Sequence, residues 1–147
     1  MNSILFFVCV LAACVTTQGY QIRQLADVLD ISRDQFDECV KNNGLNDDDF
    51  SKIHPLLFKT EMSEDEKNLM KNFSCFMACT FENAKIMKDD KVELKPLLKI
   101  VEKSNIFLNP EIKEILNDCV DEAGKRSDKC DAAFDFSSCM LRKLRYG

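Results

Sequence analysis

The sequence predicts an all-α protein, and three observations lead to this prediction. After residue 20, apolar residues recur at helical spacing, and no run alternates apolar with polar residues as a half-buried strand does. The chain has only three prolines and four glycines, so few positions interrupt a helix. Serine and asparagine residues stand where helices would begin. At this length we expect one domain.

The residue pattern in the amino-terminal part of this domain predicts two or three helices. Apolar residues between Leu25 and Val40 indicate a first helix or a bent pair, and Gly44 suits the left-handed conformation that ends many helices. Asn46 can cap the next helix, whose first turn carries three aspartates that favour the positive end of its dipole. We expect this helix to be short, because Pro55 disfavours helical geometry at the preceding residue.

The longest predicted helix begins at Ser63 and runs to about Ala84. Ser63 and Glu66 are spaced as a capping box, in which each side chain bonds the other residue's backbone N–H. Cys75 and Cys79 lie one turn apart with parallel Cβ directions, so they cannot easily bond each other. Each must reach a different neighbour, and this helix becomes the hub of the fold.

Three further helices follow, which brings the expected total to six. One carries four apolar residues on a single face, namely Leu94, Leu97, Leu98 and Val101. The next starts at Asn109, a cap residue followed by proline at the first helical position. Ser127 can cap the last helix, where Cys130 and Cys139 project from opposite faces. This last helix should therefore be clamped between two partners.

We expect residues 1–19 to be a secretory signal peptide and residues 20–147 to form the secreted, extracellular domain. Residues 4–15 are an apolar run too short to span a bilayer, and small or polar residues follow it. No other run is long enough for stable membrane insertion. Cleavage after Gly19 removes Cys9 and Cys14, and the six remaining cysteines predict three disulfides in an oxidising compartment.

Several functional classes are disfavoured. A net charge of −5 without a basic cluster argues against nucleic acid or an anionic membrane as partner. Metal-binding cysteines usually come in close pairs with histidines, and His54 is the single histidine, so no metal or cofactor is expected. Asp47–Asp49 lack the glycine and glutamate of a calcium loop, and no catalytic triad has recognisable local context. We therefore expect no enzyme activity.

The order of cysteine gaps resembles that of insect odorant-binding proteins, the pheromone- and general-odorant-binding family. The chain has 35 residues between Cys39 and Cys75, the pair Cys75-x3-Cys79, and 39 residues between Cys79 and Cys119. Ten residues then separate Cys119 from Cys130, and the last pair is Cys130-x8-Cys139. Spacing alone leaves fifteen disulfide arrangements, less those that join Cys75 to Cys79. The resemblance implies one of them, in which the pairs are Cys39 with Cys79, Cys75 with Cys130, and Cys119 with Cys139.

The resemblance also implies a function. Such proteins are compact six-helix, disulfide-stapled shells around an apolar cavity, and they transport odorants, pheromones or similar small hydrophobic ligands through extracellular fluid. Met77 and Phe81 lie about 200° around the hub helix from its sulfurs, and Ile86 and Met87 match family positions just beyond that helix. We call the expected lining the candidate wall: Met77, Phe81, Ile86, Met87, Leu98, Val101, Ile112, Leu116, Phe136 and Met140.

Other interpretations stay open at this point. Each wall residue could be ordinary packed core, and a secreted signalling or venom-type protein that acts through its surface is the alternative function. A membrane receptor or a second copy of the chain is left open as a partner. Two mechanisms are also left open: ligand release through His54 in a lid-like loop, and closure of the cavity by the carboxyl-terminal tail. Asn72-Phe73-Ser74 matches a glycosylation sequon, but its helical position argues against its use, since sequons favour exposed loops.

Overall fold

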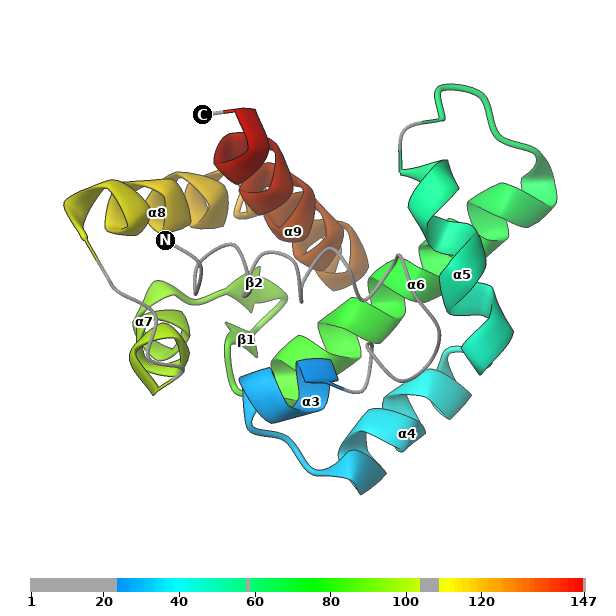
Figure 1. Cartoon of the computed structure of the whole chain (residues 1–147), viewed down its shortest axis with the longest axis horizontal. Coiled ribbons are helices and arrows are strands. Elements are labelled where there is room, and N and C mark those ends of the chain that lie inside the picture. The colour runs from blue at the N-terminus through cyan, green and yellow to red at the C-terminus, as the bar shows by residue number, and fades with distance from the viewer. Residues whose placement is uncertain (1–23, 58, 104–108, 147) are drawn as a thin grey trace.

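The computed structural model describes residues 24–57, 59–103 and 109–146 (Figure 1). Within these ranges, seven helices and one small hairpin follow each other along the chain: α3 (Gln24–Leu29), α4 (Arg33–Asn42), α5 (Asp47–Leu56), α6 (Glu64–Asn83), β1 (Met87–Lys88), β2 (Lys91–Val92), α7 (Leu94–Lys103), α8 (Pro110–Ala123) and α9 (Lys129–Tyr146). The all-α prediction is confirmed, and the first expected helix is the bent pair α3 and α4. The expected signal peptide lies outside the described residues.

Helix α6 is the hub of the fold, as the cysteine spacing predicted. It packs against α3, α4, α5, β1 and α9 and crosses the centre of the view in Figure 1. Its first turn is held by the expected capping box, in which Glu66 N–H donates to Ser63 Oγ at 3.2 Å and Ser63 N–H donates to Glu66 Oε1 at 2.9 Å. Further along, residues 73–81 are buried on almost every side because neighbours surround them.

Other predicted helix ends are also confirmed. Gly44 adopts a φ of 67°, the left-handed conformation expected after α4. Asn46 caps α5, since Asp49 N–H donates to Asn46 Oδ1 at 3.1 Å. Asn109 caps α8, where Ile112 N–H donates to Asn109 Oδ1 at 2.8 Å. Each of the two helix starts depends on side chains within one turn of the cap, which is why the sequence alone reveals them.

Two boundary predictions are wrong. Helix α5 does not stop before Pro55 but continues to Leu56, so His54 lies in a helix and not in a lid-like loop. Pro55 is one residue from the end, so its missing N–H removes only one helical bond, and Leu57 N–H still donates to the Ile53 carbonyl at 3.2 Å. Burial of the apolar face of α5, including Ile53 and Leu56, compensates for that loss.

The second wrong boundary is the start of α9. Asp128, not Ser127, is the last residue before this helix: its carbonyl accepts from Ala132 N–H at 2.9 Å, and its Oδ1 accepts from Cys130 N–H at 3.4 Å. Ser127 lies one residue too early to reach the same donors. Both residue types are good caps, so the local pattern could not choose between them.

The hairpin was not predicted. Strands β1 and β2 are two residues each and pair antiparallel, with Met87 opposite Val92. Asp89 and Asp90 form the turn with φ values of 51° and 64°, and two positive φ angles match the right-handed twist of a tight hairpin. Two-residue strands are too short to show alternation, so periodicity gave no signal here.

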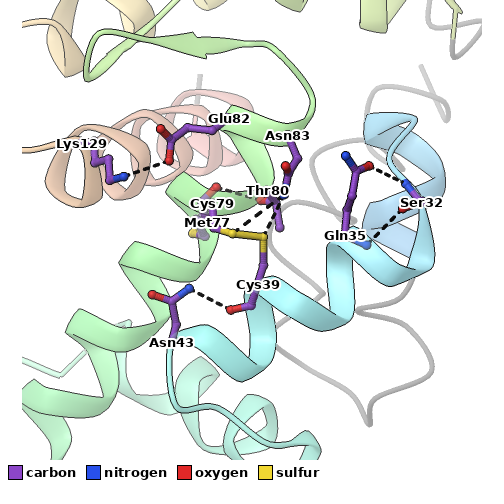
Figure 2. The surroundings of a disulfide bond; sticks show 10 residues. All are labelled: Ser32, Gln35, Cys39, Asn43, Met77, Cys79, Thr80, Glu82, Asn83 and Lys129. Atoms are coloured by element: carbon purple, nitrogen blue, oxygen red, sulfur yellow. Dashed lines mark hydrogen bonds and ion pairs between the residues drawn. A yellow bond between two sulfur atoms is a disulfide. The ribbon is translucent and has the colours of Figure 1, made fainter.

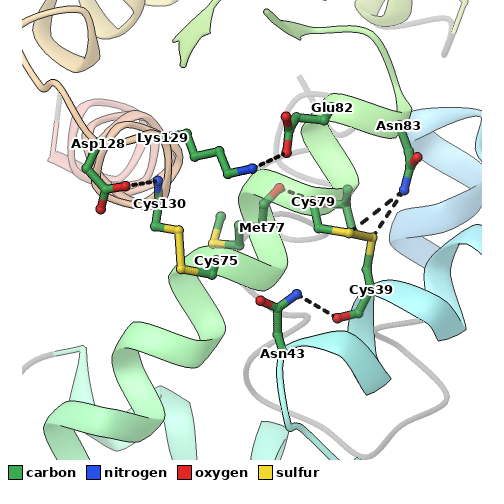
Figure 3. A network of polar contacts seen from close by, with 11 residues as sticks. Cys39, Asn43, Cys75, Met77, Cys79, Glu82, Asn83, Asp128, Lys129 and Cys130 are labelled. Atoms are coloured by element: carbon green, nitrogen blue, oxygen red, sulfur yellow. Dashed lines mark hydrogen bonds and ion pairs between the residues drawn. A yellow bond between two sulfur atoms is a disulfide. The ribbon is translucent and has the colours of Figure 1, made fainter. Parts of the chain in front are cut away.

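Three disulfides join the helices in the pairs that the family resemblance implies. Cys39–Cys79 links α4 to α6, Cys75–Cys130 links α6 to α9, and Cys119–Cys139 links α8 to α9. Figure 3 shows the first two, which leave α6 in different directions from residues one turn apart. Helix α9 is bonded to α6 through one face and to α8 through the other, as expected for cysteines nine residues apart.

Candidate functional site

All ten residues of the candidate wall lie in one hydrophobic cluster. They come from five parts of the fold: α6, the segment with β1, α7, α8 and α9. Nine of them are buried, and Leu98 is half-buried. The structure thus brings together residues that are up to 63 positions apart in the chain, from Met77 to Met140. No polar or charged side chain is among the ten.

The segment that carries β1 contributes to the candidate wall directly after α6. Ile86 N–H donates to the Phe81 carbonyl at 3.0 Å, so this segment begins directly at the end of α6. Ile86 and Met87 are 1% and 4% exposed. Val92, which sequence reasoning missed, lies opposite Met87 and is 5% exposed. The hairpin therefore adds three apolar side chains to the interior.

The Lys91 side chain anchors the hairpin to the segment that follows α8. Lys91 Nζ donates to the Gly124 carbonyl at 2.5 Å and to the Arg126 carbonyl at 2.7 Å. These carbonyls lie at the end of α8, where a positive charge is favourable. Strand β2 thereby stays in contact with α8 and α9.

Aromatic ring contacts lie in two regions of the one hydrophobic cluster. Phe81 and Phe136 meet edge to face within the candidate wall, with ring centroids 6.1 Å apart. A second group, which we call the aromatic cluster, consists of Phe36, Phe50, Phe73 and Phe76. It joins α4 and α5 to the middle of α6. The two regions share α6 but have different packing partners.

Polar contacts support the disulfide between α4 and α6. In Figure 2, Asn83 Nδ2 points at the bond and lies 3.2 Å from Cys39 Sγ and 3.9 Å from Cys79 Sγ. Asn43 Nδ2 donates to the Cys39 carbonyl at 2.8 Å. The disulfide and Asn83 thus hold the ends of α4 and α6 to each other, while Asn43 closes the end of α4 itself.

Comparison with known proteins decides the family. The PBP/GOBP family matches residues 23–143. The chain belongs to this family. It is an insect odorant-binding protein of the six-cysteine type, which is a family of binding proteins and not of enzymes.

Similar proteins include the pheromone-binding proteins Gp-9 of Solenopsis xyloni and Solenopsis aurea. Each is 26% identical over 109 residues, which cover 74% of this chain and 71% of the relative. The Gp-9 protein of Solenopsis geminata is 25% identical over the same share. No solved structure matches the chain.

This odorant-binding protein also has a surface pocket of about 380 Å³ between α5 and the start of α6. None of the candidate wall residues lines it; its lining consists of Asp49, Lys52, Leu56, Asp65, Glu66 and Leu69.

Among the residues that the structure describes, no group of three or more His, Cys, Asp or Glu is arranged to hold a metal ion. In the same ranges, no helix is both long and apolar enough to cross a membrane.

The carboxyl-terminal tail continues α9 as far as Tyr146. Arg142 Nη2 forms an ion pair with Glu122 Oε2 of α8 at 3.0 Å, and Lys143 Nζ lies 3.6 Å from Asp118 Oδ2. Leu144 is half-buried against the core. Arg142 and Lys143 therefore bind α8, while closure of a cavity by Leu144 and Tyr146 stays a prediction.

Glu66 in the capping box gives a prediction about pH. Lys59 donates to both of its carboxylate oxygens at 2.9 and 2.8 Å, and this hydrogen bonding, with the Ser63 backbone bond, lowers the pKa of Glu66 from its ordinary value. A lowered folded-state pKa stabilises the fold fully above the unfolded value, and this stability is lost as the pH falls through the folded value. Glu66→Gln should therefore destabilise the protein at pH 7.

We expect the difference in unfolding free energy between wild type and Glu66→Gln to shrink as the pH falls below about 4.5. Urea denaturation at several pH values measures it. Glu64→Gln, which removes a more exposed negative charge from the same helix turn, is the matched control. A difference that stays constant down to pH 2 would refute the assigned role of the Lys59–Glu66 pair.

Proposed function

We propose that this chain is a secreted carrier that binds small hydrophobic molecules, such as odorants, pheromones or similar lipophilic compounds, in an internal apolar cavity and transports them through extracellular aqueous fluid. The observation that supports this most is the convergence of ten apolar side chains from five parts of the fold into one cluster. Family membership and similarity to pheromone-binding proteins support the ligand class.

The composition of the candidate wall favours broad specificity. A site that selects one ligand usually has a few placed polar groups, and the candidate wall has none. Met77, Met87 and Met140 have flexible, polarizable side chains that can follow ligands of different shape. Selectivity would then come from size and apolar area more than from hydrogen bonding.

The disulfides give the fold a means to tolerate an unfilled interior. An empty cavity of ~300 Å³ would cost about 7 kcal/mol at the rate measured for voids in protein cores. That cost approaches the stability of a whole domain. Each disulfide, by closing loops of 20 to 55 residues, can contribute about 3 to 4 kcal/mol through the entropy of the unfolded chain.

Uptake of a fluorescent apolar probe tests the proposal. The oxidised domain, residues 20–147, should raise the fluorescence of the probe in a saturable manner with one site, and odorants or fatty acids should displace the probe. A protein that acts only through its surface would show no such uptake.

Secretion is tested separately, by expression of the full chain in insect cells and detection of the product in the medium.

Met77→Trp tests the placement of the binding site. Met77 is 4% exposed on α6, and the larger indole should fill the space offered to a ligand while the helical circular dichroism stays nearly unchanged. We expect the affinity for the probe to fall at least tenfold. The chain has no tryptophan, so the new residue also reports its own surroundings by fluorescence.

Met70→Trp is the matched control for this change. Met70 lies on the same face of α6, two turns earlier, is 8% exposed and is not in the candidate wall. Met70→Trp overpacks a filled part of the core and should lose about 1–3 kcal/mol of stability, whereas the indole of Met77→Trp fills the proposed cavity. Equal affinities for the probe in the two variants would remove Met77 from the site.

A further inference from the structure

We propose that Asn72 carries an N-linked oligosaccharide in the secreted protein. This inference goes beyond ligand binding and depends only on the proposed passage through the secretory route. Asn72-Phe73-Ser74 satisfies the acceptor sequon, with a residue other than proline in the middle. The helical position of the sequon argues against its use. In the folded protein, however, the Asn72 side chain is exposed to solvent.

The side chain of Asn72 lies on the outer face of α6. Asn72 is exposed, as are its helix neighbours Asn68 and Lys71. No hydrogen bond joins the Asn72 amide to the part of the chain that the structure describes. The two other sequon residues point inward, since Phe73 is 3% and Ser74 8% exposed. A sugar on Asn72 would therefore leave the core residues beside it undisturbed.

The turn between α4 and α5 lies beside the Asn72 amide. Gly44, in the turn between α4 and α5, has no side chain, and a Cβ there would lie 3.8 Å from Asn72 Nδ2. Its φ of 67° favours glycine at this position in any case. The Asn72 amide nitrogen thus lies close to this turn, and an oligosaccharide would have to leave from the exposed side of Asn72.

The transfer must occur before α6 folds. In the folded protein the Ser74 hydroxyl is buried and donates to the Met70 carbonyl at 2.8 Å, so a transferase cannot reach it. Cys75, the next residue, bonds to Cys130, which lies 55 residues later in the chain. At about 5–20 residues per second of synthesis, that partner emerges roughly 3 to 11 s after the sequon. During this interval the Cys75–Cys130 disulfide cannot form, so α6 is not yet bonded to α9, and the proposal places the transfer here.

The chemistry balances with a lipid pyrophosphate-linked oligosaccharide as donor. Asn72 Nδ2 forms a bond to C1 of the first sugar, the bond between C1 and the pyrophosphate oxygen breaks, and the amide nitrogen loses one proton. The lipid pyrophosphate is the leaving group, and no oxidation or reduction is involved.

Intact-mass spectrometry of the full chain secreted from insect cells tests the proposal. We expect the product to carry the additional mass of one oligosaccharide, which treatment with an N-glycosidase removes. Asn72→Gln should lose this mass, whereas Ser74→Thr, which keeps a hydroxyl in the sequon, should retain it. Asn68→Gln, an exposed asparagine one turn earlier and outside any sequon, is the matched control and should retain it too.

Failure of secretion and failure of modification are distinguishable. If the chain is not exported behind its own leader, the same measurement is made behind an established insect leader, so the state of Asn72 is still read. A secreted wild-type protein with the unmodified mass, equal to that expected from its sequence, would overturn the proposal. Retention of the additional mass in Asn72→Gln would overturn it as well.

Discussion

Loss of the Cys75–Cys130 disulfide, by change of both cysteines to alanine, should lower the free energy of unfolding by about 4 kcal/mol. This bond closes a 55-residue loop, the longest of the three, between the hub helix α6 and the last helix α9. The cross-link restricts the unfolded chain, and the restriction grows with the logarithm of loop length. Urea denaturation of the oxidised proteins measures the change.

The matched control is the double alanine variant at Cys119 and Cys139, whose bond closes a loop of 20 residues. Its expected loss is about 3 kcal/mol, smaller because the loop is shorter.

We further expect complete reduction to abolish probe binding before all helicity is lost, since local helix signals remain in the reduced chain. Full affinity for the probe in reductant would contradict the part assigned to the disulfides in holding the binding site together.

Phe76→Ala should lower the free energy of unfolding by about 3–5 kcal/mol. Phe76 is fully buried and is the central ring of the aromatic cluster, with centroids 5.4 Å from Phe36, 5.3 Å from Phe50 and 6.0 Å from Phe73. Its truncation leaves a cavity and removes three ring contacts, each of which adds to simple burial. Thermal and urea denaturation measure the loss.

Phe134→Ala is the matched control for Phe76→Ala. Phe134 lies on α9 and is only half-buried against the core, so the same truncation should cost clearly less. Similar losses in the two variants would mean that Phe76 is not the centre of a tightly packed region. The aromatic cluster would then have no special part in joining α4 and α5 to α6.

The features that the sequence predicted well depend on residues close together in the chain. The capping box at Ser63 and Glu66 and the asparagine caps at Asn46 and Asn109 involve partners three residues apart. The spacing of Cys75 and Cys79 was enough to predict that α6 has two covalent neighbours. Helix geometry fixes these relations within one turn, so no knowledge of the rest of the fold was needed.

The disulfide partners and the candidate wall could not be derived in this way. Spacing excluded a Cys75–Cys79 bond, and only the family resemblance singled out one pairing among the remaining arrangements. For the wall, helix direction nominated Met77 and Phe81. The contact of Phe81 with Phe136 depends on how α9 packs against α6. Val92 was missed because its position follows from pairing with Met87 across a turn.

By itself, then, the sequence determined that this chain is helical, where most helices begin, and that α6 is cross-linked to two neighbours. Only the tertiary structure decided that α5 continues past Pro55, that Asp128 caps α9, that a hairpin adds apolar side chains to the interior, and that four phenylalanines form the aromatic cluster. The reason is physical: capping acts between groups a few residues apart, whereas burial is gained only when distant segments meet and can outweigh a local helix-breaking preference.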